Sequence, residues 1–250
     1  MTQSKVAELY DRLFHFEHKR KVSKQYPIHK KLSHSFGYRD IYEYIITTEA
    51  ITNKTILDAG CGVGYGTALL AESGAQKVHG ISISTAEIRQ AVKFQTHQNL
   101  SFEVACFKDT TKESYDLIVC VESIKHSLDI QIDFDALVKG LKPQGRLIIV
   151  DDFFEGKKNK SLSNLMKKWE LKYVLKEEYL KTNAENFKIK TTDLTEFVTI
   201  SSLWKLKLNR FMSRWIMRKK VFDIFEGGWL LDELYTRGLM KYKIIYITKQ

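Results

Sequence analysis

Proline is scarce in this sequence, with 2 residues (Pro27 and Pro143) among 250. Because no low-complexity tract, internal repeat or linker divides the chain either, we predict a single domain over residues 1–250. Apolar runs are short, as at 118–121, and none approaches the ~20 residues that span a bilayer. The N-terminus becomes charged without a preceding apolar segment, which argues against a signal peptide.

Cysteine is scarce as well, and its spacing excludes two common uses. The sequence contains Cys61, Cys106 and Cys120 and no CxxC pair. An odd number without paired spacing predicts neither a disulfide framework nor a zinc site. We therefore expect reduced thiols and a cytoplasmic protein.

The net charge of +10 is unevenly distributed along the chain. Residues 1–31 carry 8 basic and 3 acidic side chains, and residues 157–220 carry 17 and 6. Residues 32–156 carry 11 basic and 17 acidic side chains, and residues 221–250 carry 4 of each. This pattern argues against a uniformly basic nucleic-acid-binding protein and favours a core with two basic additions.

Short β-branched runs alternate with helical stretches from residue 54 onward. The predicted strands are 54–58, 78–83, 100–106, 115–121 and 146–150, with helices between them such as 63–73. This βαβ rhythm predicts an α/β fold with a doubly wound, Rossmann-like and mostly parallel sheet.

The rhythm changes after residue 152. Helices are predicted over 161–183 and 203–220, and strands over 187–192 and 240–248. The sheet should therefore have about seven strands. We expect an N-terminal helical extension (1–50), a core (53–152), an inserted basic cap (153–220), and a closing helix and strand (221–250).

Four glycines follow the first predicted strand and open a helix: Gly60, Gly62, Gly64 and Gly66. Glycines at this place let the backbone turn tightly and let a ligand approach N–H groups at a helix N-terminus. The dinucleotide pattern GxGxxG fails because Tyr65 and Thr67 stand at its third position. NAD and FAD are therefore disfavoured, and no P-loop motif is present.

Asp58 precedes Gly60 by two residues, and this (D/E)xGxGxG pattern resembles that of class I S-adenosylmethionine (SAM)-dependent methyltransferases. Segments 78–84, 115–123 and 141–145 are similar to motifs of a small-molecule subgroup that includes sugar, tocopherol-type and natural-product methyltransferases. The resemblance covers 53–152 and implies SAM as cofactor and S-adenosylhomocysteine as product. It assigns the cofactor to Asp58, Gly60, Cys61, Gly62, Gly64, Ser82, Ile83, Phe107 and Glu122.

Two positions depart from the family pattern. Ser82 stands where a carboxylate usually ends the second strand and binds the ribose diol, so we expect weaker diol recognition or help from the Ile83 backbone. Glu87 could replace that acid, but Ser84-Thr-Ala-Glu87 matches a helix capping box, which is the interpretation we favour. At the end of the third strand, Cys106-Phe107 stands where the family often has Asp-Ala beside the adenine, so a carboxylate contact to adenine is not expected and Phe107 could stack on it instead.

His126 follows the fourth predicted strand, where the resembling family often has a histidine proposed as a base. An ordinary pKa near ~6.5 suits that role, although His126 could equally cap the next helix. His34 is the second candidate. Glu122, Asp151 and Asp152 could together bind magnesium, but the subgroup is metal-free, so we expect no metal.

Residues 203–220 project as a basic amphipathic helix. It is predicted either to be an ordinary cap, or to close over substrate or touch an acidic membrane surface.

The favoured function is SAM-dependent methylation of a small, apolar or lipid-like acceptor, with oxygen as the favoured acceptor atom. A nucleic-acid methyltransferase is the alternative, although no Asn-Pro-Pro-Tyr or Asp-Pro-Pro-Tyr follows the fourth strand, where Glu122-Ser123 stands. A non-catalytic binding subunit is a second alternative function, and the intact glycine loop argues against it. The sequence predicts no oligomeric state.

Overall fold

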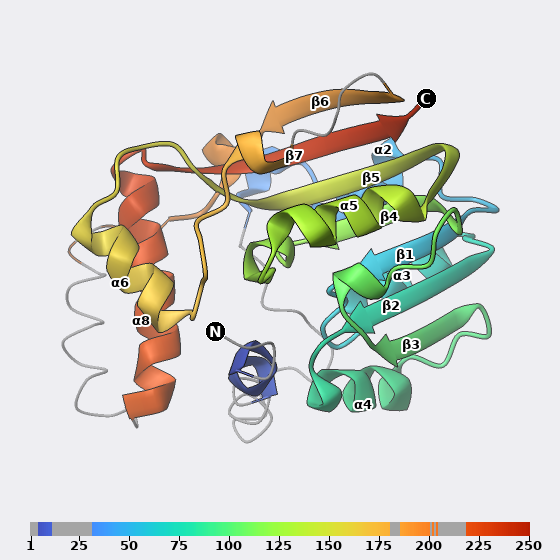
Figure 1. Ribbon diagram of the computed structural model, residues 1–250, viewed down its shortest axis with the longest axis horizontal. Coiled ribbons are helices and arrows are strands. Elements are labelled where there is room, and N and C mark those ends of the chain that lie inside the picture. Colours follow the sequence, from blue (N-terminus) through green and yellow to red (C-terminus); the bar gives the residue numbers. More distant parts are fainter. Residues whose placement is uncertain (1–4, 12–31, 181–185, 201, 203, 205–218) are drawn as a thin grey trace.

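The computed structural model describes residues 5–11, 32–180, 186–200, 202, 204 and 219–250. Its centre is a seven-stranded sheet in the order β3-β2-β1-β4-β5-β7-β6 (Figure 1). The strands are β1 Thr55–Ala59, β2 Lys77–Ser82, β3 Leu100–Val104, β4 Tyr115–Val121, β5 Leu141–Phe154, β6 Phe187–Asp193 and β7 Met240–Lys249. The first five are parallel, and β7 runs antiparallel to both neighbours. This confirms the predicted fold class.

Helices cover both faces of the sheet. They are α2 Ile41–Thr48, α3 Tyr65–Glu72, α4 Thr85–Phe94, α5 Ile130–Gly140, α6 Lys160–Lys168 and α8 Lys219–Thr236. Short 3-10 turns are η1 His34–Phe36, η2 Phe107–Asp109, η3 Ile124–His126, η4 Glu177–Leu180 and η6 Thr195–Phe197. Residues 5–11 form a further helix. In Figure 1 it lies between α4 and the α6–α8 pair, on the side toward which β1 and β2 point.

The central strand β4 is apolar from Leu117 to Val121 because both of its faces are covered there. Leu117 and Val119 belong to the core cluster that packs on α2 and α3, whereas Ile118 and Cys120 belong to the cluster that packs on α5. All four side chains are fully buried. Continuous apolar runs of this kind are typical of parallel strands between two helical layers. This burial fixes the carboxyl end of β4, where the site residues lie.

Two predictions of local structure were wrong in extent. The helix predicted over 161–183 ends at Lys168, where Glu170 takes a positive φ of 51° and the Leu171 N–H bonds the Met166 carbonyl at 2.8 Å. That closure is a left-handed helix C-terminus. Strand β5 begins at residue 141, before the predicted 146.

The predicted basic helix 203–220 lies outside the described residues except at 204, 219 and 220. Its proposed lid or membrane contact therefore stays a prediction. No helix in the described part of the chain has the length and apolarity needed to cross a bilayer.

Candidate active site

The glycine loop between β1 and α3 leaves open space beside Gly62. This residue has a φ of +53°, and the nearest atom to a Cβ built on it is Glu87 Oε1 at 4.0 Å. A Cβ on Gly66 would instead lie 2.0 Å from the Tyr42 ring, so packing alone requires glycine there. Side chains also fill the space beside the other two loop glycines, with Ser123 beside Gly60 and Phe102 beside Gly64. Gly62 is thus where the loop can admit a ligand.

Backbone hydrogen bonds hold this loop against the end of β2. The N–H groups of Gly60 and Cys61 both donate to the Ile81 carbonyl, at 2.8 and 2.9 Å. Gly64, with a φ of +79°, begins helix α3. Burial raises the pKa of the Cys61 thiol well above its ordinary value, so the thiol stays neutral. Residues 60–64 can therefore bind a ligand through the shape of their backbone and through its N–H groups.

Asp58 ends β1 beneath the loop and is fully buried. Its two carboxylate oxygens accept hydrogen bonds from Tyr42 Oη at 2.9 Å and Thr67 Oγ1 at 2.7 Å. Burial nevertheless raises the pKa of Asp58 to about 6, although both hydroxyl donors oppose that shift. Tyr42 comes from α2, so the N-terminal extension helps to hold Asp58 in place.

Replacing Asp58 with asparagine is expected to stabilise the fold at neutral pH. The folded pKa lies above the ~3.9 of an unfolded aspartate, so this group stabilises the fold most below about pH 4, and that stabilisation is lost as the pH rises through about 6. Asp58→Asn should therefore raise the free energy of unfolding by up to ~3 kcal/mol at pH 7.5, from about two pKa units at ~1.4 kcal/mol each. Urea denaturation at pH 7.5 and pH 4 measures this. A gain that persists at pH 4, or a loss at pH 7.5, would contradict it.

The end of β2 differs from its sequence-based interpretation. Ser84 caps α4 by accepting the Glu87 N–H at 3.1 Å, as predicted. The Glu87 carboxylate, however, does not complete a capping box at the Ser84 N–H, because that N–H bonds Ser82 Oγ at 3.2 Å. Glu87 Oε2 instead accepts the Ser82 hydroxyl at 2.8 Å. The carboxylate therefore lies at the end of β2, and partly buried Ile83 lies between this serine and α4.

The helix 5–11 contacts the first turn of α4. Asp11 Oδ1 accepts hydrogen bonds from Ser84 Oγ at 2.5 Å and from the Ala86 N–H at 3.2 Å. A carboxylate is favourable at this place because of the positive end of the helix dipole. On the other side of the loop, Phe107 begins η2 and is partly buried against the core under α5. Its stacking on adenine stays a prediction.

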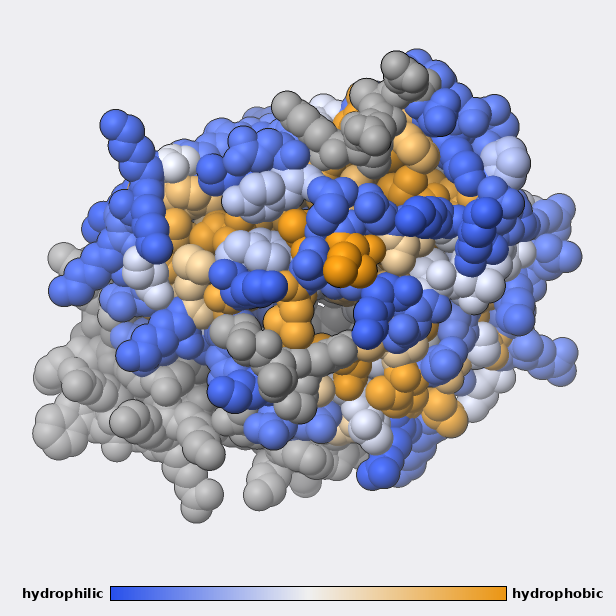
Figure 2. Space-filling view, viewed as in Figure 1, coloured by the Kyte–Doolittle hydropathy of each residue, from blue (hydrophilic) through white to orange (hydrophobic). Residues whose placement is uncertain are grey.

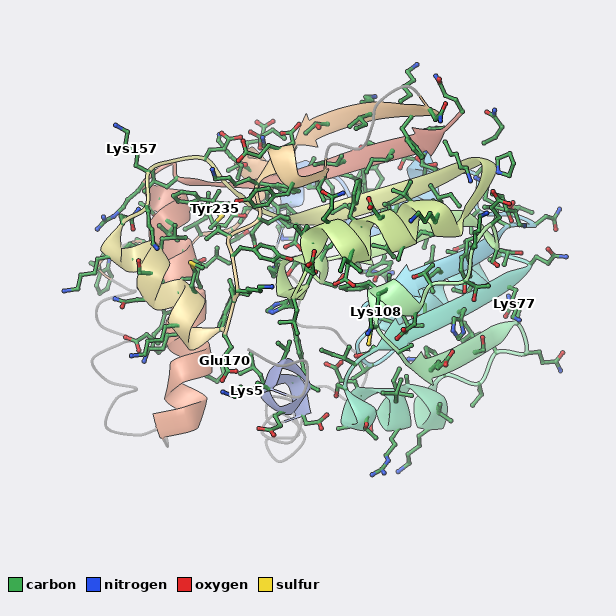
Figure 3. The ribbon with its side chains drawn as sticks, viewed as in Figure 1. Lys5, Lys77, Lys108, Lys157, Glu170 and Tyr235 are labelled. Carbon is green, nitrogen blue, oxygen red and sulfur yellow. The ribbon has the colours of Figure 1, made fainter. Side chains whose placement is uncertain are left out.

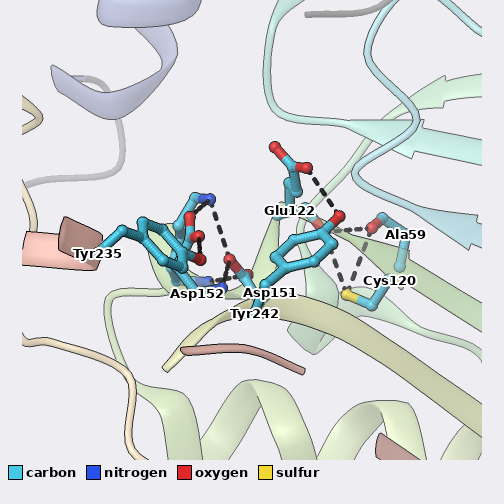
Figure 4. A network of polar contacts seen from close by, with 9 residues as sticks. Ala59, Cys120, Glu122, Asp151, Asp152, Tyr235 and Tyr242 are labelled. Carbon is cyan, nitrogen blue, oxygen red and sulfur yellow. Dashed lines mark hydrogen bonds and ion pairs between the residues drawn. The ribbon is translucent and has the colours of Figure 1, made fainter. Parts of the chain in front are cut away.

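A buried polar network lies at the carboxyl ends of β4 and β5 (Figure 4). Lys125 Nζ contacts Asp151 Oδ1 at 3.0 Å and Asp152 Oδ2 at 2.8 Å. Tyr235 of α8 also donates to Asp152. Burial alone would lower the pKa of Lys125, but the carboxylates raise it well above its ordinary value. Lys125 is therefore a fixed cation at this edge of the sheet.

Glu122 belongs to the same edge and has a strained backbone. Its φ is +50°, a conformation that non-glycine residues rarely adopt and that is often found at functional sites. The Glu122 N–H donates to the Val150 carbonyl at 2.7 Å, and its carboxylate accepts the Tyr242 hydroxyl at 2.9 Å. These two hydrogen bonds fix the carboxyl end of β4 within the site.

Chelation is expected to leave activity unchanged. The Lys125 ammonium lies within about 3 Å of both Asp151 and Asp152, where a divalent cation would otherwise bind. Among the described residues, no group of three or more His, Cys, Asp or Glu side chains is arranged to hold a metal ion. Methyl transfer measured with EDTA should equal that without it. Loss of turnover with EDTA and its recovery with magnesium would contradict the prediction.

His126 ends η3 beside this network and is surrounded by aromatic rings. Its ring centroid lies 5.2 Å from that of Tyr10, edge to face, and 6.5 Å from that of Trp169. His126 Nδ1 is closed off from solvent and has no hydrogen-bond partner among the described residues. Burial, helped by the Lys125 ammonium, lowers the pKa of His126 to about 3. The ordinary pKa expected from the sequence was wrong, and the imidazole is neutral at physiological pH.

His34, the second predicted candidate, lies away from this cluster. It is exposed in η1, which packs against η6. No contact of the described residues joins His34 to the His126 cluster.

In Figure 2 the surface is hollowed near the middle of the face shown, between hydrophobic and hydrophilic residues.

The site residues that were not singled out from the sequence include Tyr10, Tyr42 and Lys125. Two of them come from the N-terminal extension, more than 80 residues before β5, and no local motif links them to the loop. Lys125 is adjacent to His126, but its burial between two aspartates depends on the pairing of β4 with β5. Their roles follow from tertiary contacts.

A doubly wound sheet with this glycine loop and strand order defines a class I SAM-dependent methyltransferase. The sequence model of the methyltransferase domain family matches residues 51–208, and the chain belongs to that family.

Similar proteins include two ubiquinone biosynthesis O-methyltransferases. The protein from Idiomarina loihiensis is 25% identical over 193 residues, which cover 73% of each chain. The one from Hydrogenovibrio crunogenus is 32% identical over 108 residues, and this match spans 41% of the present chain and 44% of that relative. Geranyl diphosphate C-methyltransferase from Streptomyces coelicolor, solved with Mg²⁺, geranyl diphosphate and S-adenosylhomocysteine, has a TM-score of 0.72 at 16% identity over 99% of this chain and 97% of its own. That likeness shows the shared fold.

Proposed function

We propose that this methyltransferase transfers the methyl group of SAM to a hydroxyl oxygen of a small, largely apolar molecule. The observation that carries the proposal is the buried Nδ1 of His126, which has no partner among the described residues. A buried polar atom without a partner costs free energy, so such atoms usually mark a place where a ligand or water binds. A hydroxyl of the acceptor would supply the missing hydrogen.

The residues present fit SAM at the glycine loop. The space beside Gly62, which a Cβ would fill, lies at the carboxyl edge of the sheet, where ligands of open α/β folds bind. SAM supplies a methyl group carried on a sulfonium, which is electrophilic without further activation. The chain therefore has to orient the acceptor and receive its proton.

The lowered pKa of His126 favours a hydroxyl over an ammonium as the acceptor. An imidazole whose pKa is about 3 is too weak a base to deprotonate an ammonium, which has no lone pair until it loses its proton. A neutral hydroxyl already has a lone pair, and it can donate its hydrogen to His126 Nδ1 while that lone pair attacks. As the oxygen gains the methyl group, its proton becomes acidic enough to pass to a weak base.

Aromatic rings beside His126 favour an apolar acceptor. Tyr10 and Trp169 contact the imidazole from two directions, and Lys125 Nζ lies 5.8 Å from the Trp169 ring centroid. Flat rings bury much apolar area and would hold an aromatic or lipid-like molecule. Burial also raises the pKa of Tyr10, so its hydroxyl stays protonated beside the acceptor.

The nucleic-acid alternative is less well supported by the described surface. Exposed lysines such as Lys5, Lys77, Lys108 and Lys157 come from separate parts of the molecule (Figure 3). A phosphate backbone is usually bound by basic residues gathered along one face. The basic segment 205–218 lies outside the described residues, so the membrane contact proposed for 203–220 is left to experiment.

Methyl-labelled SAM and a panel of matched acceptors test the proposal. The panel contains an alkyl-substituted phenol, the same compound with its hydroxyl methylated, the corresponding aniline and alkylamine, and an RNA. We expect label in the phenol and not in its methylated form, the alkylamine or the RNA. Label in the alkylamine or the RNA, with none in the phenol, would contradict the proposal.

A further inference from the structure

Two adjacent glycines, Gly227 and Gly228, lie in the middle of α8, where glycine destabilises a helix relative to alanine. They differ in what surrounds them. A Cβ built on Gly227 would lie 2.1 Å from Trp169 Nε1 and 2.4 Å from Trp169 Cδ1. A Cβ built on Gly228 would meet nothing within 4 Å in the described part of the chain. Gly227 is therefore the position at which the indole of Trp169 requires a bare backbone.

Helix α6, which ends just before Trp169, is joined to α8 at both of its ends. Lys168 Nζ forms an ion pair with Glu226 Oε2 at 2.7 Å, directly beside the contact of Trp169 with α8. At the start of α6, Ser161 Oγ donates to Glu233 Oε1 at 3.0 Å. An added methyl group at position 227 would therefore displace the indole more easily than it would separate the two helices.

The indole that lies against Gly227 also borders the place proposed for the acceptor. Its ring centroid is 6.5 Å from that of His126, and Lys125 Nζ lies 5.8 Å from it. In Figure 1, α8 lies to the left of the strands whose carboxyl ends carry the site. An indole displaced away from α8 would therefore move toward the acceptor and reduce the space left for it.

We propose that Trp169, lying against Gly227, sets the size of the acceptor by closing the site on one side of His126. The inference rests on the proposed function, in which the acceptor hydroxyl donates to His126 Nδ1. A substituent next to that hydroxyl would meet the indole, whereas a substituent across the ring would point away from it. Gly227 is a positioning residue, because its missing side chain lets the indole lie back against α8.

Binding of two phenols to the full chain, saturated with S-adenosylhomocysteine, tests the inference by calorimetry without requiring methyl transfer. One phenol carries a branched alkyl group beside its hydroxyl, and its isomer carries the same group at the para position. Gly227→Ala should weaken binding of the ortho isomer ~10-fold, a usual cost of overpacking, and that of the para isomer by less than ~3-fold. Trp169→Phe should strengthen binding of the ortho isomer relative to the para isomer, because phenylalanine is smaller than the indole.

Gly228→Ala is the matched control, since it adds the same methyl group to the next residue of the same helix, where the space is open. It should leave both affinities unchanged and raise the melting temperature. The double variant Gly227→Ala with Trp169→Phe should recover the affinity for the ortho isomer, because Nε1, the atom nearest to the added methyl group, is gone. Ligand-free thermal melts will show whether Gly227→Ala folds, and Trp169→Phe carries the test if it does not.

The outcomes separate this inference from the proposed function. Equal losses for the two isomers in Gly227→Ala, or no recovery in the double variant, would overturn the size selection. An unchanged preference in Trp169→Phe would overturn it too, even if the unmodified chain transfers label from SAM to a phenol. Phenols that bind in the expected order but receive no label would support the size selection and contradict the proposed function alone.

Discussion

Gly62→Val is expected to abolish SAM binding while the protein stays folded. The open space beside Gly62 would be filled by two methyl groups, at the place where we propose that the loop admits its ligand. The φ of +53° is also unfavourable for a β-branched residue, which adds backbone strain. Calorimetry with S-adenosylhomocysteine measures the loss directly.

Gly238→Val is the matched control for backbone strain. Gly238 has a φ of +69° with nothing within 4 Å of a built Cβ, and it lies beyond the end of α8, away from the loop. This variant should lose stability in a thermal melt and keep its affinity. If Gly62→Val binds S-adenosylhomocysteine as tightly as the unmodified chain, the cofactor does not lie on this loop.

His126→Ala is expected to lower the rate of methyl transfer ~10²–10⁴-fold, the usual cost of losing a group that receives a proton. Affinity for SAM should be unchanged, because His126 contacts Tyr10 and Trp169, where we propose that the acceptor binds, and not the glycine loop. The pH profile adds a second readout. With a pKa of about 3, His126 should cause no fall in rate near pH 6.5, where an ordinary histidine titrates.

His97→Ala serves as the control, since His97 is exposed and contacts Glu72. It should have normal turnover. Turnover of His126→Ala close to that of the unmodified chain would contradict the role proposed for this residue. A rate that falls with a midpoint near pH 6.5 and loses this dependence in His126→Ala would show that the imidazole titrates as an ordinary histidine.

The strand pattern was predictable because it depends on local periodicity. The strand predicted at 115–121 is β4 with the same bounds, since a strand buried on both faces is a continuous apolar run flanked by polar residues. The glycine loop was predictable for a similar reason. Positive φ at Gly62 and Gly64 and close packing at Gly66 leave a signature in the sequence itself.

The side chains that complete the site could not be predicted, because their partners are distant in sequence. Glu87 matches a capping box by spacing, and only the position of Ser82 at the end of β2 turns its carboxylate toward the loop. Tyr10 meets His126 across more than 100 residues. The end of α6 was missed because Glu170 adopts a left-handed conformation that its residue type does not predict.

A crystal structure with S-adenosylhomocysteine bound is the most direct test of where this methyltransferase binds its cofactor and acceptor. We predict that the cofactor lies over Gly62, at the carboxyl ends of β1 and β2. The sulfur should face the space beside His126 Nδ1, with Tyr10 and Trp169 bordering it. A ligand bound away from Gly62, or a sulfur that faces away from His126, would contradict the account.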